Sequence, residues 1–425
     1  MRIINKVYTI VLLLFVTSVQ AQRTTSSPYS RFGYGLLNEK SLSFGQGLSN
    51  TGIALRPSNH LSFINPASLS AIDSSHFIFE VGVKNQFTTI ETGGQKATTS
   101  NTNMEYLGVG FPVTRWWGTG LTMIPFSKIG YSFLQSQTLA DATTIKTYYY
   151  GIGGSNQVVW GNGFKPIKGL SIGINVGLIF GETTLEAYND LTTDLLSENT
   201  LKTNTIDMKG FYVESGVQYE IKLNNKKSIV FGAIFSPDQK LKSKNSLLVK
   251  TTVSGGTIVE NTVDVPTKSD LPMKIGGGLG FLVKDKLQCG VDYKYQNWTN
   301  STIFETSSRY FQKMQTVNFG IEYLPNKYAL SGYYKKIRYR FGARFLQSNI
   351  ALPEKQSDTK LYSVNEMSAS LGFGLPLKMS ANNVNLAFEY GSRSTKSSVM
   401  PKETFFVINL NFTLNENWFY KRKIK

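Results

Sequence analysis

Apolar and polar side chains alternate with a period of two residues along most of the chain from His76 onward. The alternation is clearest over residues 211–221, 287–296 and 406–414. Successive side chains of a strand point to opposite faces, so each segment has one apolar and one polar face. A membrane barrel requires this arrangement, with lipid outside and a wet lumen inside. The fold class expected is all-β, a transmembrane antiparallel β-barrel.

The first 21 residues have the pattern of a secretory signal peptide. Arg2 and Lys6 precede an apolar run from Val7 to Val16, and Val19-Gln20-Ala21 supplies small residues for cleavage after Ala21. The run is shorter than the roughly 18–20 residues that a membrane helix needs. No cysteine follows the cleavage site, so a lipid anchor is not expected. Because the signal peptide predicts export, the main alternative to a membrane barrel is a soluble all-β protein that is secreted.

Composition narrows the class of protein further. The chain has 27 Phe, 22 Tyr and 38 Gly but only 17% charged residues, which is typical of an outer-membrane barrel. The net charge of +17 suits contact with outer-membrane lipids and lipopolysaccharide, whereas nucleic acid is a poor partner for an exported protein. The single Cys289 excludes an internal disulfide framework. His60, His76 and Cys289 have no metal-ligand spacing, so neither metal nor cofactor is expected.

The links between the alternating segments predict the topology. Short links are expected at Pro112–Arg115, Asn162–Lys168, Leu223–Lys226, Lys284–Lys286, Pro325–Lys327 and Leu377–Asn382. Longer polar links are expected at Glu91–Asn103, Ser136–Thr143, Ala187–Asn204, Pro237–Leu271, Ser307–Gln312, Asn349–Lys360 and Thr395–Lys402. Short periplasmic turns and long extracellular loops distinguish the two sides of bacterial barrels. Counting through the links gives about fourteen strands in the bacterial outer membrane, with both termini in the periplasm.

A barrel of this size needs something in its lumen. About eight strands leave a lumen that side chains nearly fill, whereas about sixteen leave an aqueous channel. Residues 22–75 are glycine-rich and apolar without a sustained period, so we expect an N-terminal plug, or hatch. Residues 76–425 then form the barrel and a short basic periplasmic tail. Before that tail, Trp418, Phe419 and Tyr420 would lie in the aromatic girdle at the inner interface.

The stretch Leu61–Ile72 contains the motif Asn65-Pro66-Ala67. Pro66 lacks an N–H, and Asn65 before it is driven towards extended geometry, which predicts an apolar segment with a fixed bend. A glycine-rich N-terminal segment, this motif and then antiparallel strands together resemble the FadL/TodX family of outer-membrane transport proteins. The resemblance implies a plugged channel for passive uptake of hydrophobic small molecules, either long-chain fatty-acid-like or aromatic compounds, with Asn65, Pro66 and Ala67 as a plug or gate motif.

The same barrel admits other functions, because a fold does not determine a function. It could be a non-transporting FadL-like subunit or shuttle of an outer-membrane secretion or assembly machine, as in the Por-type system. A structural barrel with a sealed lumen is a third possibility. None of these functions is enzymatic.

Four basic residues, Lys336, Arg338, Arg340 and Arg344, share one parity in a segment whose other parity is apolar. They are therefore expected to point into the lumen. They could form a ladder for an anionic ligand, or they could form ion pairs. Buried charges need partners, so pairing is favoured, with the candidate partners Glu214, Glu220, Asp292, Glu322 and Glu389.

Two motifs are interpreted as structural. Gly169-Leu-Ser171-Ile-Gly173 matches a hydrolase pattern, but no strand–turn–helix elbow is expected there, because the segment continues as a strand. Gly276–Gly280 has no phosphate-binding helix after it. Glycine within a strand marks a bulge, a bend or the close approach of another backbone, which here could be the plug.

Overall fold

The computed structural model describes residues 25–74, 76–138, 144–191, 199–253, 256–304, 308–354, 360–377, 382–397 and 400–417. The predicted signal peptide, the aromatic residues 418–420 and the basic tail lie outside the described residues. Among the described helices, none is long and apolar enough to span a membrane.

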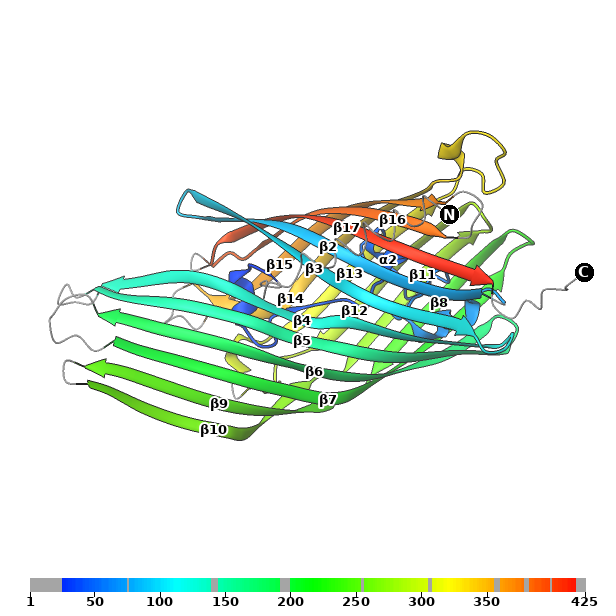
Figure 1. Cartoon of the computed structure of the whole chain (residues 1–425). Coiled ribbons are helices and arrows are strands. Elements are labelled where there is room, and N and C mark those ends of the chain that lie inside the picture. Colours follow the sequence, from blue (N-terminus) through cyan, green and yellow to red (C-terminus); the bar gives the residue numbers. More distant parts are fainter. Residues whose placement is uncertain are drawn as a thin grey trace, which may run out of the picture.

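The wall is a single antiparallel sheet that closes on itself, because β17 pairs with β2 (Figure 1). Its first strands are β2 (His76–Thr92), β3 (Gln95–Pro112), β4 (Trp117–Thr138), β5 (Thr144–Ile167), β6 (Leu170–Leu191) and β7 (Asn199–Lys222). The next are β8 (Lys227–Ser236), β9 (Gln239–Val253), β10 (Gly256–Leu271) and β11 (Lys274–Val283). The remaining strands are β12 (Leu287–Asn297), β13 (Lys313–Tyr323), β14 (Arg338–Pro353), β15 (Leu361–Pro376), β16 (Asn383–Ser394) and β17 (Lys402–Asn417).

Two of the wall strands are interrupted. β8 and β9 both pair with β7, and they are separated by Pro237 and Asp238. β10 pairs with β9, and β11 pairs with β8. β10 and β11 therefore form the next wall strand, which is interrupted at Pro272 and Met273, opposite the first break. Proline cannot donate to a ladder, which explains both breaks. With each interrupted pair counted as one strand, the wall has the fourteen strands predicted.

The wall has two unlike rims. The turn rim carries the links 113–116, 168–169, 223–226, 284–286, 324–337 and 377–382, and β17 also ends there. The hairpin rim is opposite, where β2 turns into β3 at Gly93 and Gly94. Figure 1 shows the turn rim on the right and the long hairpins on the left.

The predicted parity of the strands is confirmed. On β12, Val291 and Tyr293 are exposed on the outside, whereas Asp292 and Lys294 are buried. On β17 the outward set likewise includes Leu410 and Phe412, and the buried set includes Asn409, Asn411 and Thr413. The barrel therefore has an apolar outer surface and a polar interior, as a lipid-facing wall requires.

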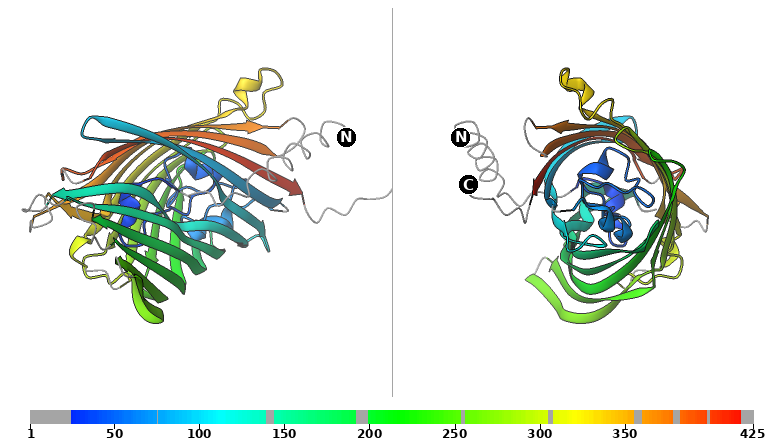
Figure 2. Two further views of the ribbon diagram at one scale, coloured as in Figure 1. Left: turned by 60° about the vertical axis from the view of Figure 1, so that its left-hand side comes forward. Right: turned by 90° about the vertical axis from the view of Figure 1, so that its right-hand side faces the viewer.

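The described part of the predicted plug, Thr25–Ser74, lies inside the barrel, and we call it the lumenal segment (Figure 2, right). Its elements are η1 (Pro28–Arg31), β1 (Leu36–Leu37), α2 (Ser43–Gln46) and η2 (Pro66–Ala71). It packs against glycines of the wall. A Cβ at Gly232 would lie 2.2 Å from the Ile53 carbonyl oxygen, and one at Gly278 would lie 2.9 Å from the Ile53 Cβ. The close approach expected at Gly276–Gly280 is therefore made by this segment.

Several predicted link positions are wrong. Residues 91–103 and 237–271 belong largely to paired strands, so the hairpins extend further than their polarity suggested. Residues 91–103 are polar on both faces, because they project beyond the apolar part of the wall, whereas β10 exposes Ile258, Val259 and Val263. The short link predicted at Pro325–Lys327 is a 14-residue connection, 324–337, that includes η4 (Tyr333–Lys335).

Candidate functional site

The predicted basic ladder is an ion-pair system inside the barrel. Arg338 Nη1 and Arg340 Nε lie 2.9 and 2.6 Å from the two carboxylate oxygens of Glu322. Arg340 also donates to the Asn385 side chain. Lys336 is an exception, because it is the C-cap of η4 and lies two residues before β14 begins at Arg338. It therefore does not belong to the strand as predicted, since the turn before β14 is longer than its sequence suggested.

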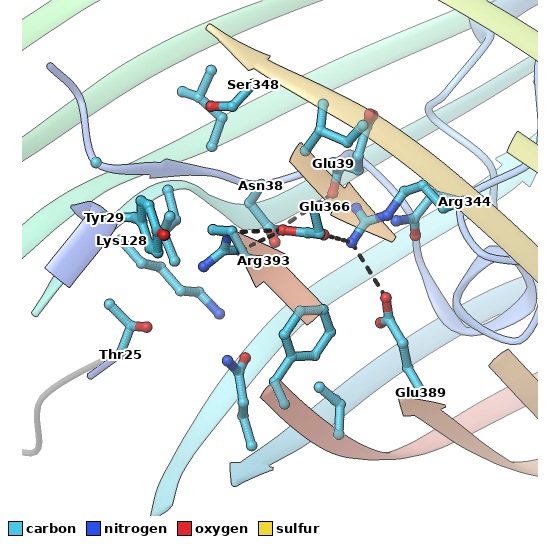
Figure 3. A pocket seen from close by; sticks show the side chains of 18 of the residues that line it. Thr25, Tyr29, Asn38, Glu39, Lys128, Arg344, Ser348, Glu366, Glu389 and Arg393 are labelled. Atoms are coloured by element: carbon cyan, nitrogen blue, oxygen red, sulfur yellow. Dashed lines mark hydrogen bonds and ion pairs between the residues drawn. The ribbon is translucent and has the colours of Figure 1, made fainter. Parts of the chain in front are cut away.

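A second group continues the ion pairs across β14, β15, β16 and β17 (Figure 3). Glu366 lies between Arg344 and Arg393, and it accepts from Arg393 Nε at 3.0 Å. Arg344 also contacts Glu389 at 3.2 Å, and Arg393 contacts Glu403 at 2.8 Å. Buried charges are tolerated in such networks because each has a partner. Glu322 and Glu389 are predicted partners, whereas Glu366 and Glu403 were not anticipated.

Two of the other predicted acidic partners, Glu214 and Asp292, have different roles. Glu214 on β7 pairs with Lys40 of the lumenal segment and with Lys274 on β11. Asp292 accepts the backbone N–H groups of Gly52 and Ile53 at 2.6 and 2.9 Å. Neither contacts an arginine of the ladder, so these acids bind the lumenal segment instead.

Two more wall carboxylates bind the lumenal segment. Glu403 accepts from the Ser27 hydroxyl. Glu80 Oε1 lies 2.9 Å from His60 Nδ1 and accepts from Ser43 at 3.1 Å. Burial lowers the pKa of His60, so its imidazole is neutral near pH 7 and donates to Glu80 as an ordinary hydrogen bond. His60 is thus a buried structural residue, and the described residues contain no group of side chains suited to hold a metal.

Asn65, Pro66 and Ala67 lie where the lumenal segment touches the wall. Asn65 caps η2 by accepting from the Ala67 N–H at 3.1 Å. Its amide donates to the carbonyls of Ile53 at 2.8 Å and of Val217 on β7 at 3.1 Å. Pro66 supplies the first residue of η2, where a missing N–H costs nothing. The motif therefore joins the segment both to itself and to a wall strand.

The wall opens between β3 and β4. These strands pair only over Leu107–Pro112 and Gly118–Met123. Beyond that, β3 pairs only with β2, and β4 turns away at a bulge between Pro125 and Ser127. Pro125 cannot donate to a ladder, and a bulge bends a strand, so the break has a local cause. We call this opening the lateral gap.

The lumenal segment covers the free edge of β4 in the lateral gap. Leu36 and Leu37 of β1 pair with Lys128 and Ser127. The Asn38 N–H donates to the Phe126 carbonyl at 2.9 Å, and the Ser27 N–H donates to the Gly130 carbonyl at 2.8 Å. Lys128 also contacts Glu105 of β3 across the gap at 2.6 Å. The free edge of β4 is thus hydrogen-bonded by the lumenal segment, which lies inside the barrel.

Two small cavities adjoin this region. One of about 130 Å³ lies beside Glu105, Lys128, Arg344, Glu366 and Arg393 (Figure 3). Another of about 100 Å³ lies beside Phe126, Tyr212, Trp298 and Lys274. Small-molecule pockets usually enclose about 300–1,000 Å³. Both cavities lie between the lumenal segment and the wall.

Solved structures share this architecture. The CymD monoaromatic hydrocarbon channel matches with a TM-score of 0.58 at 14% identity, over 89% of this chain and 98% of that chain. The toluene transporter TodX of Pseudomonas putida matches with a TM-score of 0.59 at 16% identity, over 90% and 100%. A FadL homologue of Pseudomonas aeruginosa matches with a TM-score of 0.58 at 12% identity, over 91% and 100%.

The protein is thus a closed FadL-like barrel, which confirms the fold that the resemblance implied. The chain belongs to the BamG family, whose model matches residues 3–425. No curated protein matches the sequence significantly.

Close packing at the motif gives a direct test of how the lumenal segment is positioned. A Cβ at Gly173 on β6 would lie 2.4 Å from both the Ala67 nitrogen and the Pro66 carbonyl carbon. We predict that Gly173→Leu displaces η2 while the wall remains assembled. The barrel should keep its heat-dependent gel mobility, but limited proteolysis should cut the lumenal segment faster. Gly277→Leu is the matched control, because a Cβ there meets nothing within 4 Å. Equal proteolysis of the two variants would contradict the prediction.

Proposed function

We propose that this protein is a non-transporting subunit of an outer-membrane machine that assembles or secretes proteins. The observation that carries the proposal is the connection 324–337 on the turn rim. The other links of that rim are turns of two to six residues, but this one is a 14-residue loop, which we call the rim loop. It projects outward from the barrel, as the yellow loop at the top of Figure 2 shows.

The base of the rim loop is joined by a backbone hydrogen bond and an ion pair. The Asn326 N–H donates to the Lys335 carbonyl at 2.8 Å, and Lys327 pairs with Asp285 at 2.9 Å. Its tip nevertheless exposes Leu330 fully, and Tyr328 and Tyr334 at 73% and 61% of their full surface. Tyrosines are enriched in protein interfaces, and a preformed loop loses little entropy on binding. The tip therefore suits contact with a protein partner.

The interior of the barrel supports the same proposal. The lumenal segment is bound to the wall by buried carboxylates, and both nearby cavities are small. The larger cavity is lined by several charged groups, whereas the smaller one is lined mainly by apolar and aromatic side chains. Moving the segment would expose several buried charges without their partners, which is costly. The short turns further support a turn rim that faces the periplasm, where a partner would meet the rim loop.

The rim loop can be tested by changing its tip alone. We predict that Leu330→Ser with Tyr334→Ser leaves barrel stability nearly unchanged, because exposed side chains contribute little, about 0.5 kcal/mol or less. Co-purification with a large assembly or secretion barrel should fall about tenfold or more, since interface hot spots cost about 2 kcal/mol each. Ile258→Ser with Val263→Ser, two equally exposed residues of the β9–β10 hairpin, is the control. Wild-type protein that purifies without any such barrel would contradict the proposal.

Passage of hydrophobic small molecules is the second candidate function, and the lateral gap favours it. The gap opens the lumen towards the lipid, and among the described residues only the lumenal segment pairs with the free edge of β4 there. The CymD and TodX channels have the same fold. A compound leaving the lumen through this gap would need β1 to separate from β4. Asn65, Pro66 and Ala67 would then determine how the segment returns to its place.

Locking the lateral gap distinguishes the two candidates. Leu37 and Ser127 are register partners of β1 and β4, so Leu37→Cys with Ser127→Cys in a Cys289→Ser background should form a disulfide. If the gap passes ligands, oxidation should abolish uptake of toluene or a long-chain fatty acid, and reduction should restore it. If the protein is a non-transporting subunit, we predict that co-purification with the partner barrel is the same before and after oxidation. A control pair, Leu134→Cys with Tyr148→Cys, joins the adjacent wall strands β4 and β5. Oxidation of this pair should change neither ligand uptake nor co-purification with a partner barrel.

A further inference from the structure

Three lysines form a row across adjacent strands, 10 to 12 residues from the hairpin ends of those strands. Lys242 on β9 is the register partner both of Lys209 on β7 and of Lys268 on β10. Register partners carry their side chains on the same face, with Cβ atoms about 4.5–5.5 Å apart. All three lysines are exposed. We call this set the lysine row.

The lysine row faces outward from the barrel. Each lysine has a neighbour in its own strand that points the other way and is buried, namely Met208, Leu241 and Thr267. Successive side chains of a strand alternate between faces, so the lysines project away from the lumen. They are available to a ligand outside the wall.

The row lies at the edge of the apolar outer surface. Phe211, two residues after Lys209 on the same face of β7, is 72% exposed, and Val213, Val217 and Tyr219 continue that face towards the turn rim. In a membrane, lipid would cover these apolar residues, so the row would lie at the level of the headgroups. A lipid in the leaflet nearest the hairpin rim could then contact Phe211 with its acyl chains and the lysines with its headgroup.

The row has an unbalanced charge. Like charges directly opposite one another destabilise a sheet. Among the described residues, none of the three ammonium groups forms an ion pair, whereas Lys244 nearby pairs with Asp264 at 2.9 Å. The adjacent carboxylates, Asp207 and Asp270, are register partners of Lys244 and Lys240, one row away on either side. A bound anion would remove the repulsion that the protein leaves uncompensated.

We propose that Lys209, Lys242 and Lys268 bind the phosphate group of a phosphorylated lipid in the leaflet nearest the hairpin rim. Phosphate is the anion that suits them, because lysine binds it as a point charge. A lipid is favoured over a free phosphate ion because Phe211, the next outward residue after Lys209 on β7, begins an apolar face beside the row. The proposal requires a membrane around the apolar wall, but it is independent of which candidate function is correct.

The test compares lipids with and without phosphate on the full-length barrel in detergent. Binding of a bisphosphorylated glycolipid such as lipid A, and of its dephosphorylated form, is measured by native mass spectrometry. We expect the phosphorylated lipid to bind the wild type at least about tenfold more tightly than the variant Lys209→Gln, Lys242→Gln, Lys268→Gln, since each lysine near an anionic headgroup contributes favourably. The dephosphorylated lipid should bind the two proteins equally, and the difference should shrink at high salt.

The matched control removes three charges elsewhere. Lys226→Gln, Lys284→Gln and Lys286→Gln change exposed lysines on the turn rim, and this variant should bind the phosphorylated lipid as the wild type does. Equal losses in the two triple variants would overturn the proposal, because they would show a nonspecific effect of net charge. Inorganic phosphate that binds the row as tightly as the lipid would overturn the assignment to a lipid. A heat-dependent shift in gel mobility equal to that of the wild type confirms that each variant is folded.

Discussion

Four carboxylates of the barrel wall bind the lumenal segment at separate points along its length. Glu403 binds Ser27, Glu214 binds Lys40, Asp292 binds the backbone of Gly52 and Ile53, and Glu80 binds His60. These acids come from β17, β7, β12 and β2, so they surround the lumen. An unpartnered charge in such a place is costly, which means that the wall and the segment each need the other. These four carboxylates therefore find partners in the segment, whereas Glu322, Glu366 and Glu389 pair with arginines of the wall itself.

This arrangement also explains the lateral gap. The wall leaves one edge of β4 without a neighbouring strand, and an open edge invites pairing with another chain. The lumenal segment supplies that pairing through β1 and Asn38. The carboxylates hold the segment firmly enough for this role. A barrel that only supports partners would keep the gap closed, whereas a channel would have to open it against these bonds.

The sequence predicted the features that depend on local pattern. Alternation correctly assigned the faces of β12 and β17 and the start of the wall at His76, and the proline of Asn65-Pro66-Ala67 marked the bend at η2. Arg338, Arg340 and Arg344 were correctly expected to face inward. Their partners were only partly predicted, because Glu366 and Glu403 meet Arg344 and Arg393 through the register of separate strands, which a sequence does not display.

The errors have a related origin. The stretch 91–103 has polar residues on both faces, as a loop would, but those strands simply extend beyond the lipid. Lys336 continues the parity of β14 in the sequence, although it caps the 3-10 turn η4 and lies two residues before that strand begins. The polarity of a segment thus predicted whether it faces lipid or water better than it predicted whether the segment forms a strand or a loop.

The central claim is that buried wall carboxylates hold the lumenal segment, and removing one of them tests it most directly. Glu214→Gln should lower the free energy of unfolding by about 3–5 kcal/mol, because it leaves Lys40 and Lys274 without a charged partner. It should also speed hydrogen exchange in residues 36–42. Glu91→Gln, which removes the exposed pair with Lys96, should cost about 1 kcal/mol or less. Equal stability of the two variants, with unchanged exchange in the segment, would contradict the account.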